Sequence, residues 1–407
     1  MAEKRKDSRG YLLNSGEHQR SDGRYSFSYT DKEHNRRIIY AKSLVELRQK
    51  ELKIIKEIDN GLKPGAAERM TLNDLHTRYM SQKYNLKFTT KHNYQYMYDR
   101  FVKDSFGKRR ISTITYTDIK KFYYSLLESE KLKPNTLETI HNSVHPALDM
   151  AVRDNVLMKN PSDGVMKDIK QSKLWVKKKR HSLTIPQQNA FLKYAKEDKQ
   201  FQGWVPIITV LLGTGMRIGE CLALKWEDLD LDKRMIYVKH SLTNRPNGKG
   251  QVEAHVDTPK TDAGIRTIPM LDEVYDAFLE EYMIQTCLGF CTEEIDGYSG
   301  FIFSSSNGTV YRDTSVNHAI HRIADAYNAK ELENAKRERR ETLLLPNFSA
   351  HHLRHTFATR LCENESNLKV IQSVMGHADI ETTLDVYAEA TDEKKLEVIA
   401  NLNGKIL

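Results

Sequence analysis

The sequence predicts a multidomain protein with three unlike parts: a small α+β module, then an all-α domain, then a mainly α domain with a small antiparallel β-sheet. The chain has 407 residues, which is enough for two or three domains. Hydrophobic residues make up 39% of it, so ordinary cores can form. Their spacing changes along the chain from strand-like to helical and then to a mixture, and this change separates the three parts.

The N-terminal module is expected over residues 1–62. Aromatic and β-branched residues lie on both sides of the polar turn TDKEHN, which predicts a β-hairpin. A helix follows, because Ser43 and Glu46 have the spacing of a capping box and Gly61 stands just past its end. The apolar residues at helical spacing between these signals are Leu44, Leu47, Leu52, Ile55 and Ile58.

The middle part, residues 71–165, is expected to be a four-helix domain, followed by a basic linker at 166–181. The predicted helix starts are Thr71 with Asp74, Thr89 or Thr90, Thr117 and Asn135. The second helix carries Tyr94, Tyr96 and Tyr98. These rings either stack on nucleic-acid bases or form the core and rim of an amphipathic helix, and we prefer the second interpretation.

The third part, residues 182–390, mixes helical and strand patterns. The predicted helices are 185–197, 202–213, 271–284, 315–328, 352–362, 367–375 and 380–388, with an exposed charged helix at 330–341. The predicted strands are 235–239, 252–256 and 265–269, with the turn NRPNGKG between the first two. The tail, residues 391–407, carries an apolar stripe at helical spacing.

The charge of the chain points to a polyanionic partner. The net charge is +8 and the sequence pI is near 9.0, with an excess of basic residues concentrated in 71–180. Four cysteines are too few for a disulfide framework, so we expect reduced thiols. No apolar run is long enough to span a membrane, and the N-terminus is too polar for a signal peptide. We therefore expect a cytoplasmic, nucleoid-associated protein without a membrane partner.

Two short segments of the third part place a cation at a turn. In GTGMRIGE, residues 213–220, a glycine turn is expected to launch a helix that carries Arg217. A guanidinium beside the N–H groups of a helix start suits a phosphodiester. In DTPKTDAGIRTIPM, residues 257–270, Lys260 lies beside a tight turn between two strands, where it can give a proton to a leaving oxygen. Either residue alone is commonplace.

The segment HHLRHTFAT, residues 351–359, offers two interpretations. His351 and Arg354 are three residues apart, so a possible acid or base and a phosphate-binding cation share one helix face. Alternatively, His351 and His355 form a zinc pair. A zinc-protease helix has a glutamate between its histidines and needs a third ligand, and the segment supplies neither. We expect no metal site.

The segment MGHADIETTLDVY, residues 375–387, completes a set that suits DNA phosphodiester cleavage. The six candidate catalytic residues are Arg217, Lys260, His351, Arg354, His377 and Tyr387. The two arginines stabilise the charge that develops on the non-bridging oxygens. Tyr387 is the nucleophile, His351 its base, Lys260 the acid for the leaving oxygen, and His377 a hydrogen-bond donor to the phosphate. This chemistry needs no Mg²⁺, ATP or other cofactor.

These segments resemble the boxes of the tyrosine recombinases, the phage lambda integrase-like family, and most closely those of integrases from conjugative transposons. Their order and spacing carry the resemblance. It implies a site-specific recombinase that integrates and excises a mobile element through a 3′-phosphotyrosine intermediate and a Holliday junction. Glu220 is expected to be a structural partner of the arginine region, and Glu389 stands where many relatives have histidine.

The resemblance also implies domain roles and partners. Residues 1–62 correspond to an arm-type DNA-binding module, 71–165 to the core-binding domain and 182–390 to the catalytic domain. The implied partners are double-stranded DNA, three further copies of the chain in a homotetramer, and a small excisionase-type directionality factor. The tail 391–407 docks on a neighbouring protomer or folds back on its own domain. A type IB topoisomerase and a non-enzymatic DNA-binding regulator remain as alternatives.

Overall fold

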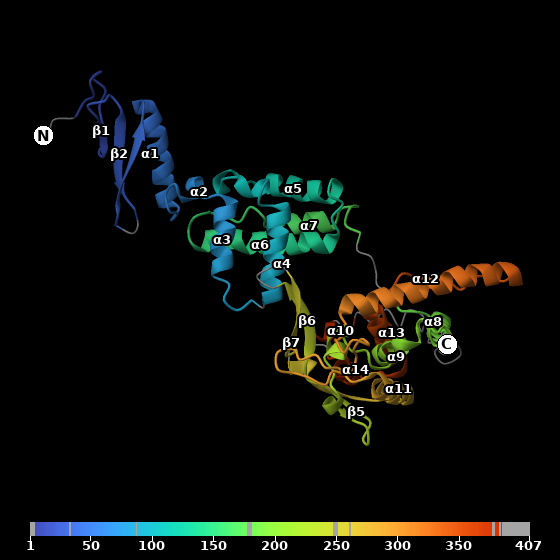
Figure 1. Ribbon diagram of the computed structural model, residues 1–407. Helices are drawn as coiled ribbons and strands as arrows, with labels where there is room; N and C mark the ends of the chain where they lie inside the picture. Colours follow the sequence, from blue (N-terminus) through green and yellow to red (C-terminus); the bar gives the residue numbers. More distant parts are fainter. Residues whose placement is uncertain are drawn as a thin grey trace, which may run out of the picture. The chain divides into compact units, whose positions relative to one another are not determined.

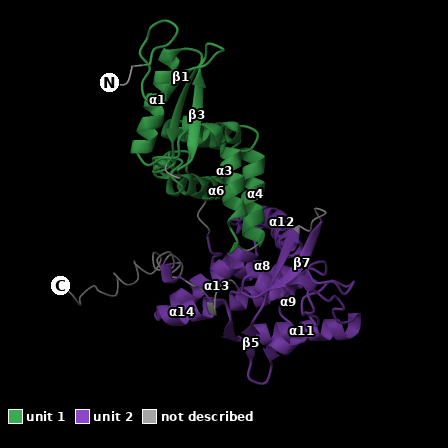
Figure 2. Ribbon diagram, turned by 90° about the vertical axis from the view of Figure 1, so that its left-hand side faces the viewer, with its two compact units in different colours: residues 1–178 green, residues 179–407 purple. Residues whose placement is uncertain are grey.

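The computed structural model describes residues 5–376, except 32–33, 87, 177–180, 247–250 and 260–261, together with 379–381 and 384. The chain divides into two compact units, residues 1–178 and 179–407 (Figure 2). Lys260, His377, Tyr387 and the tail 391–407 lie outside the described residues, as does most of the predicted helix 380–388.

Unit 1 begins with a three-stranded antiparallel sheet and one long helix (Figure 1). The strands are β1 (Glu17–Gln19), β2 (Tyr25–Thr30) and β3 (Arg36–Ala41), paired in that order. The predicted hairpin is confirmed as β2–β3. Strand β1 was not predicted, because three residues are too few to show an alternating pattern.

Helix α1 (Leu44–Asp59) starts where the capping signal predicts, with the Ser43 hydroxyl accepting from the N–H of Glu46 at 3.2 Å. Its predicted apolar stripe is only partly buried. Leu47 is fully buried, whereas Leu52 and Ile55 are 69% and 42% exposed. A six-residue strand presents about three side chains on each face, which cover only the first turns of a sixteen-residue helix.

The rest of unit 1 is helical and shares one core. Its helices are α2 (Ala66–Arg69), α3 (Leu72–Ser81), α4 (Phe88–Phe101), α5 (Tyr116–Glu128), α6 (Pro134–Arg153) and α7 (Val165–Lys170). Helix α5 begins after Thr115, two residues before the predicted start. Helix α7 lies almost entirely within 166–181, the stretch predicted to be a linker. Val165 and Ile169 are fully buried in the same core, so the packed chain continues past the predicted boundary.

The three tyrosines of α4 contribute to the core and its rim, which confirms the preferred interpretation. Tyr98 is 2% exposed and its ring stacks on that of His76 at a centroid distance of 3.5 Å. Tyr94 packs against the core, and Tyr96 lies at the surface, where its hydroxyl accepts from Arg100 Nη1 at 2.7 Å.

Unit 2 is built around helix α9 (Val205–Thr214), which is apolar on nearly all sides and buried. It contacts four other helices: α8 (Ile185–Glu197), α10 (Ile218–Leu222), α11 (Asp272–Leu288) and α13 (Ala350–Asn364). Helix α14 (Leu368–Met375) packs on α13 through Cys362 and Ile371. These helices match the predicted ones to within a few residues.

The strands of unit 2 include the three predicted ones and others that were not predicted. The described strands are β4 (Leu229–Asp230), β5 (Met235–Val238), β6 (Ser241–Pro246), β7 (Val252–Asp257) and β8 (Arg266–Pro269). Strand β6, which was not predicted, includes the first three residues of NRPNGKG and pairs with β7. Strand β5 pairs with β8, with Ile236 opposite Ile268. The segment NRPNGKG was predicted as a turn because Asn, Pro and Gly are turn formers.

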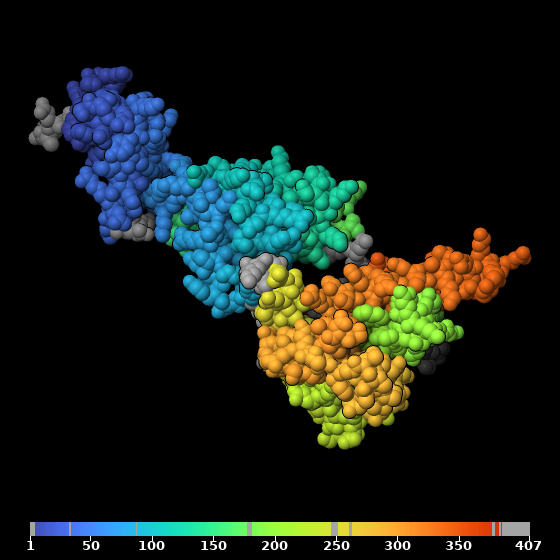
Figure 3. All heavy atoms as spheres, in the orientation of Figure 1, coloured from blue at the N-terminus to red at the C-terminus, as the bar shows by residue number. Residues whose placement is uncertain are grey.

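Helix α12 (Asp313–Glu338) unites two predicted helices into one of 26 residues. It packs against α8 through Tyr194 and Tyr327, and its C-terminal end extends beyond α8 (Figure 3). No helix among the described residues is long and apolar enough to cross a membrane. The four cysteines are free thiols, and Cys287 is the exposed one.

The capping box of α5 gives a stability test. Thr115 accepts from the N–H of Asp118 at 3.2 Å, and the Asp118 carboxylate accepts from the N–H of Thr115 at 3.0 Å. We expect Thr115→Ala to lower the free energy of unfolding by about 1 kcal/mol, because the N–H of Asp118 loses its acceptor and the Asp118 carboxylate loses the hydrogen bond from the Thr115 hydroxyl. The exposed neighbour Thr117 provides the control, and Thr117→Ala should change stability by less than about 0.5 kcal/mol in urea unfolding. Equal losses of stability from the two substitutions would contradict the capping role of Thr115.

Candidate active site

Arg217 stands at the turn between α9 and α10. Helix α9 ends at Gly215, whose φ of 62° is left-handed, and Arg217 is the N-cap of α10. A Cβ at position 215 would lie 2.3 Å from Phe357, so the turn needs glycine for space as well as for conformation. The predicted glycine turn and helix start are confirmed. The Arg217 side chain is 45% exposed.

His351 and Arg354 lie in the first two turns of α13, as predicted. His351 is exposed, whereas Arg354 is 5% exposed. Arg354 donates from Nη1 to the carbonyl of Gly215 at 2.6 Å and from Nη2 to the carbonyl of Met375 at 2.6 Å. Both carbonyls belong to C-terminal ends of helices, where the partial negative charge of the helix dipole stabilises a cation. The arginine therefore holds the ends of α9 and α14 together.

Glu220 is the acidic centre of this region. Its carboxylate is 3% exposed and accepts from Arg217 Nη1 at 2.7 Å, from the N–H of Arg217 at 3.0 Å and from Arg266 Nη2 at 2.9 Å. Burial by itself raises the pKa of the Glu220 carboxyl. Arg266 and Arg217 outweigh burial and hold that pKa below its ordinary value. The predicted structural role of Glu220 agrees with these contacts.

Three arginines converge on the last turn of α14. The carbonyl of Val374 accepts from Arg266, that of Met375 from Arg354 and that of Gly376 from Arg217, at 2.8, 2.6 and 3.3 Å. These arginines come from β8, α13 and the start of α10. Helices α10, α13 and α14 lie close together in unit 2 (Figure 1). A helix end leaves its last carbonyls without helical partners, and here side chains supply the donors.

The local charge favours an anion. Arg217 and Arg266 share the one carboxylate of Glu220, and Arg354 is held by neutral carbonyls. Burial, together with the neighbouring charge of Arg217, lowers the pKa of Arg354 to about 9. A lowered pKa means that the surroundings disfavour the cation, so an added anion would stabilise the site. A phosphate group has the charge and the acceptor oxygens to do this.

Among the predicted residues, the structure brings Arg217 and Arg354 together at the end of α14, immediately before His377 in the chain. Arg266 was not among the predicted site residues, although it lies inside the segment DTPKTDAGIRTIPM. The sequence shows Arg266 only as an arginine in a predicted strand, three residues before Pro269. Arginines are common in strands at the protein surface, so this position gave no indication of a role. Only its burial, at 4% side-chain exposure, distinguishes it.

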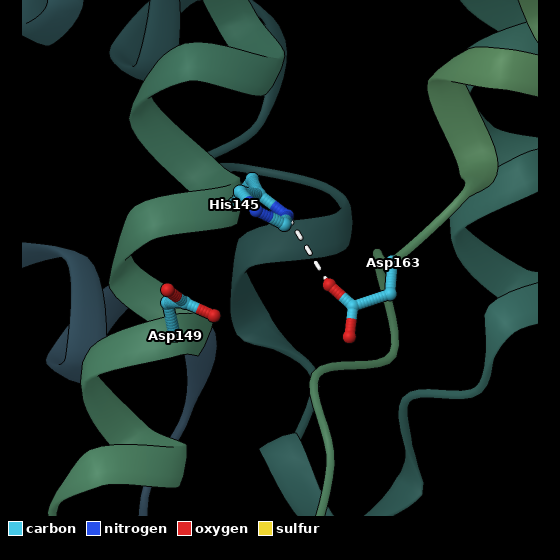
Figure 4. A group of neighbouring side chains, drawn as sticks. All are labelled: His145, Asp149 and Asp163. Carbon is cyan, nitrogen blue, oxygen red and sulfur yellow. Dashed lines mark ion pairs between the residues drawn. The ribbon is translucent and has the colours of Figure 1, made fainter.

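A second polar group lies in unit 1, where His145, Asp149 and Asp163 approach one another (Figure 4). The His145 Nδ1 atom lies 2.8 Å from the Ser162 hydroxyl and 3.9 Å from an Asp163 oxygen. Asn160 Nδ2 donates to Asp149 and to the carbonyl of His145, each at 3.2 Å. We interpret the group as a network that fixes the turn after α6. The zinc pair His351 and His355 does not appear with a third ligand among the described residues.

Two segments of the chain match models of known protein families. Residues 181–394 match the model of the phage integrase family, and residues 1–58 match the DNA binding domain of the Tn916 integrase. The transposase from transposon Tn916 of Enterococcus faecalis is 30% identical over 99% of this chain and 98% of its own length. The ICEBs1 integrase of Bacillus subtilis is 27% identical over 76% of each chain.

A solved structure agrees with these relatives. The Tn1549 transposon integrase in complex with transposon right-end DNA is 30% identical and superposes with a TM-score of 0.71, covering 82% of this chain and all of that one. A lambda integrase dimer bound to a core site has a TM-score of 0.54 at 16% identity, which shows a shared fold.

Gly376 tests the geometry at the end of α14. Its φ is 62°, and a Cβ there would lie 2.9 Å from Arg266 Nη1 and 3.0 Å from the carbonyl oxygen of Ala263. We expect Gly376→Ala to lower the free energy of unfolding by about 2–4 kcal/mol, through backbone strain and collision together. Gly297 also has positive φ but open space, so Gly297→Ala should cost only about 1 kcal/mol. Urea unfolding measures both, and equal losses would contradict the collision.

Proposed function

The chain belongs to the phage integrase family and is a site-specific recombinase of the tyrosine type, and we propose that it cuts and rejoins double-stranded DNA with the six residues predicted from its sequence. Those residues are Arg217, Lys260, His351, Arg354, His377 and Tyr387. We propose that the DNA is the end of a mobile element and its target, because the similar Tn1549 integrase was solved on transposon DNA.

The convergence of Arg217 and Arg354 on adjacent carbonyls, those of Gly376 and Met375, is the observation that supports this proposal most strongly. Two guanidiniums that reach neighbouring oxygens of one helix end can reach the two non-bridging oxygens of one phosphate. Arg217 is the more exposed of the pair and Arg354 is braced by helix ends. The arrangement supplies fixed positive charge without reorganisation, which is the condition for stabilising a transition state electrostatically.

The proposed cleavage step forms one bond and breaks another. The Tyr387 oxygen attacks the scissile phosphorus while its proton passes to His351. The bond from phosphorus to the 5′ oxygen breaks, and Lys260 protonates that oxygen, so a 5′-hydroxyl leaves. His377 donates a hydrogen bond to a non-bridging oxygen. A 5′-hydroxyl of another strand then attacks the 3′-phosphotyrosine and restores the diester, and no external energy source is needed because the energy of the diester is conserved.

The remaining parts of the chain carry proposed binding roles. We assign arm-site DNA to residues 1–62, whose family match is a DNA binding domain, and core-site DNA to the helices of 71–165. Strand exchange between two duplexes requires four tyrosines, so the active assembly is a homotetramer, with the tail 391–407 docked on a neighbouring protomer. A small excisionase-type protein sets the direction. The match with integrases over nearly the whole chain favours recombination over DNA relaxation by a topoisomerase.

Replacing the nucleophile tests the reaction directly. We expect Tyr387→Phe to abolish the covalent protein–DNA product on a nicked crossover-site duplex while leaving DNA affinity unchanged, because only one oxygen is lost. Tyr282, a half-exposed tyrosine of α11, is the matched control, and Tyr282→Phe should form the product at the wild-type rate. Denaturing gels measure the product, and a wild-type band from Tyr387→Phe would refute the assignment.

The proposed acid is tested by changing the leaving group. Lys260→Ala should slow cleavage by about 100-fold or more on ordinary DNA and far less when sulfur replaces the scissile 5′ oxygen, because a thiolate leaves without a proton. Lys233, an exposed turn lysine before β5, is the control, and Lys233→Ala should not distinguish the two substrates. An equal loss on both substrates for Lys260→Ala would remove this residue from the acid role.

A further inference from the structure

Arg266 is a buried cation beside the site that the proposed reaction leaves without a role. It begins β8, and its side chain is 4% exposed. All three of its donor nitrogens are used: Nη2 with Glu220 at 2.9 Å, Nε with the carbonyl of Val374 at 2.8 Å and Nη1 with that of Gly264 at 3.2 Å. Each nitrogen of Arg266 thus donates to a group of the protein, and one of these groups is a carboxylate, so we look for its effect on the reaction in these neighbours.

Glu220 connects Arg266 to Arg217. One carboxylate lies between a buried arginine and a half-exposed one, and it accepts from both. Because Arg266 shares the negative charge, the Arg217 guanidinium keeps positive charge for a ligand. Without Arg266, the buried carboxylate would have Arg217 as its remaining cation among these contacts and would draw it inward. Removing one member of a buried ion pair leaves an uncompensated charge, so the geometry around Glu220 would change.

The end of α14 is the second connection. Arg266 binds the carbonyl of Val374, and the next two carbonyls bind Arg354 and Arg217. The same guanidinium therefore fixes the helix end against which both phosphate-binding candidates are oriented. It also lies 2.9 Å from the position of a Cβ on Gly376, so there is little space for the helix end to shift toward it.

We propose that Arg266 is a positioning residue for strand cleavage, which sets the Arg217 guanidinium through Glu220 and the end of α14 through Val374. This inference rests on the proposed function, since it takes Arg217 and Arg354 to bind the scissile phosphate. In this role Arg266 acts through Glu220 and the end of α14 and does not itself bind the phosphate.

The first measurement is single-turnover cleavage by the full-length chain on the nicked crossover-site duplex at saturating protein. Arg266→Met should lower the rate by about 100-fold, because a small misplacement of a catalytic group is costly, while the affinity for DNA changes by less than about threefold. Arg360→Met is the matched control: Arg360 also joins a glutamate, Glu363, to a carbonyl, that of Leu183, but toward the other end of α13. Its rate should stay near that of the wild type.

The second measurement separates positioning from a general loss of structure. A methylphosphonate at the scissile position replaces one charged oxygen by a methyl group, so less positive charge is needed in the transition state. The rate defect of Arg266→Met should shrink at least about tenfold on this neutral substrate, as the defect of Arg217→Ala should. A defect of equal size on both substrates, or a wild-type rate on ordinary DNA, would overturn the proposal.

Two further variants keep the outcome decisive. If Arg266→Met does not fold, Arg266→Lys replaces it, because lysine keeps the charge near Glu220 but cannot bind all three acceptors. Its defect should be smaller than that of Arg217→Ala and should likewise shrink on the neutral substrate, and a defect that does not shrink overturns the proposal. Tyr387→Phe is measured in the same experiment. A covalent product from Tyr387→Phe refutes the proposed function regardless of the Arg266 results. If only the Arg266 variants behave otherwise than expected, the proposed function is unaffected.

Discussion

The buried carboxylate of Glu220 is the interaction on which the arrangement of the site depends. An ionised group at 3% exposure is unfavourable unless its charge is compensated, and the compensation comes from Arg217 on one side and Arg266 on the other. The carboxylate thereby links α10 to β8, which are 46 residues apart along the chain. Because it also accepts from the N–H of Arg217, the backbone at the start of α10 is fixed together with the side chain.

The end of α14 is the counterpart of that carboxylate. Its last carbonyls provide acceptors for three arginines, and the helix dipole adds partial negative charge at the same place. Neutral acceptors compensate a buried cation only partly, and the lowered pKa of Arg354 reflects this. The site is therefore assembled with more positive charge than the described residues neutralise, a state that a phosphodiester would stabilise.

The two units differ in how their hydrophobic cores are built. Unit 2 has a continuous core around the apolar helix α9, which holds the arginine-bearing elements rigidly. Unit 1 divides its apolar residues between a helical core and a much smaller one that involves the sheet, Leu44 and Leu47. The small core leaves Leu52 and Ile55 of α1 exposed, so this module has a larger apolar surface than its sequence pattern suggests.

The sequence by itself determined what depends on neighbouring residues. The predicted capping residues Ser43 and Thr71 begin their helices as predicted, because their hydrogen bonds span only three positions. The positions of Arg217 after a glycine turn and of Arg354 after a helix start were likewise predicted from neighbouring residues.

Tertiary structure alone decided the rest. The pairing of β5 with β8, the existence of β6 and the role of Arg266 all depend on contacts between distant residues. Arg266 meets Val374 across 108 positions, and no local periodicity encodes such a contact. Whether an arginine lies on the surface or holds an active-site carboxylate is set by what the fold places around it.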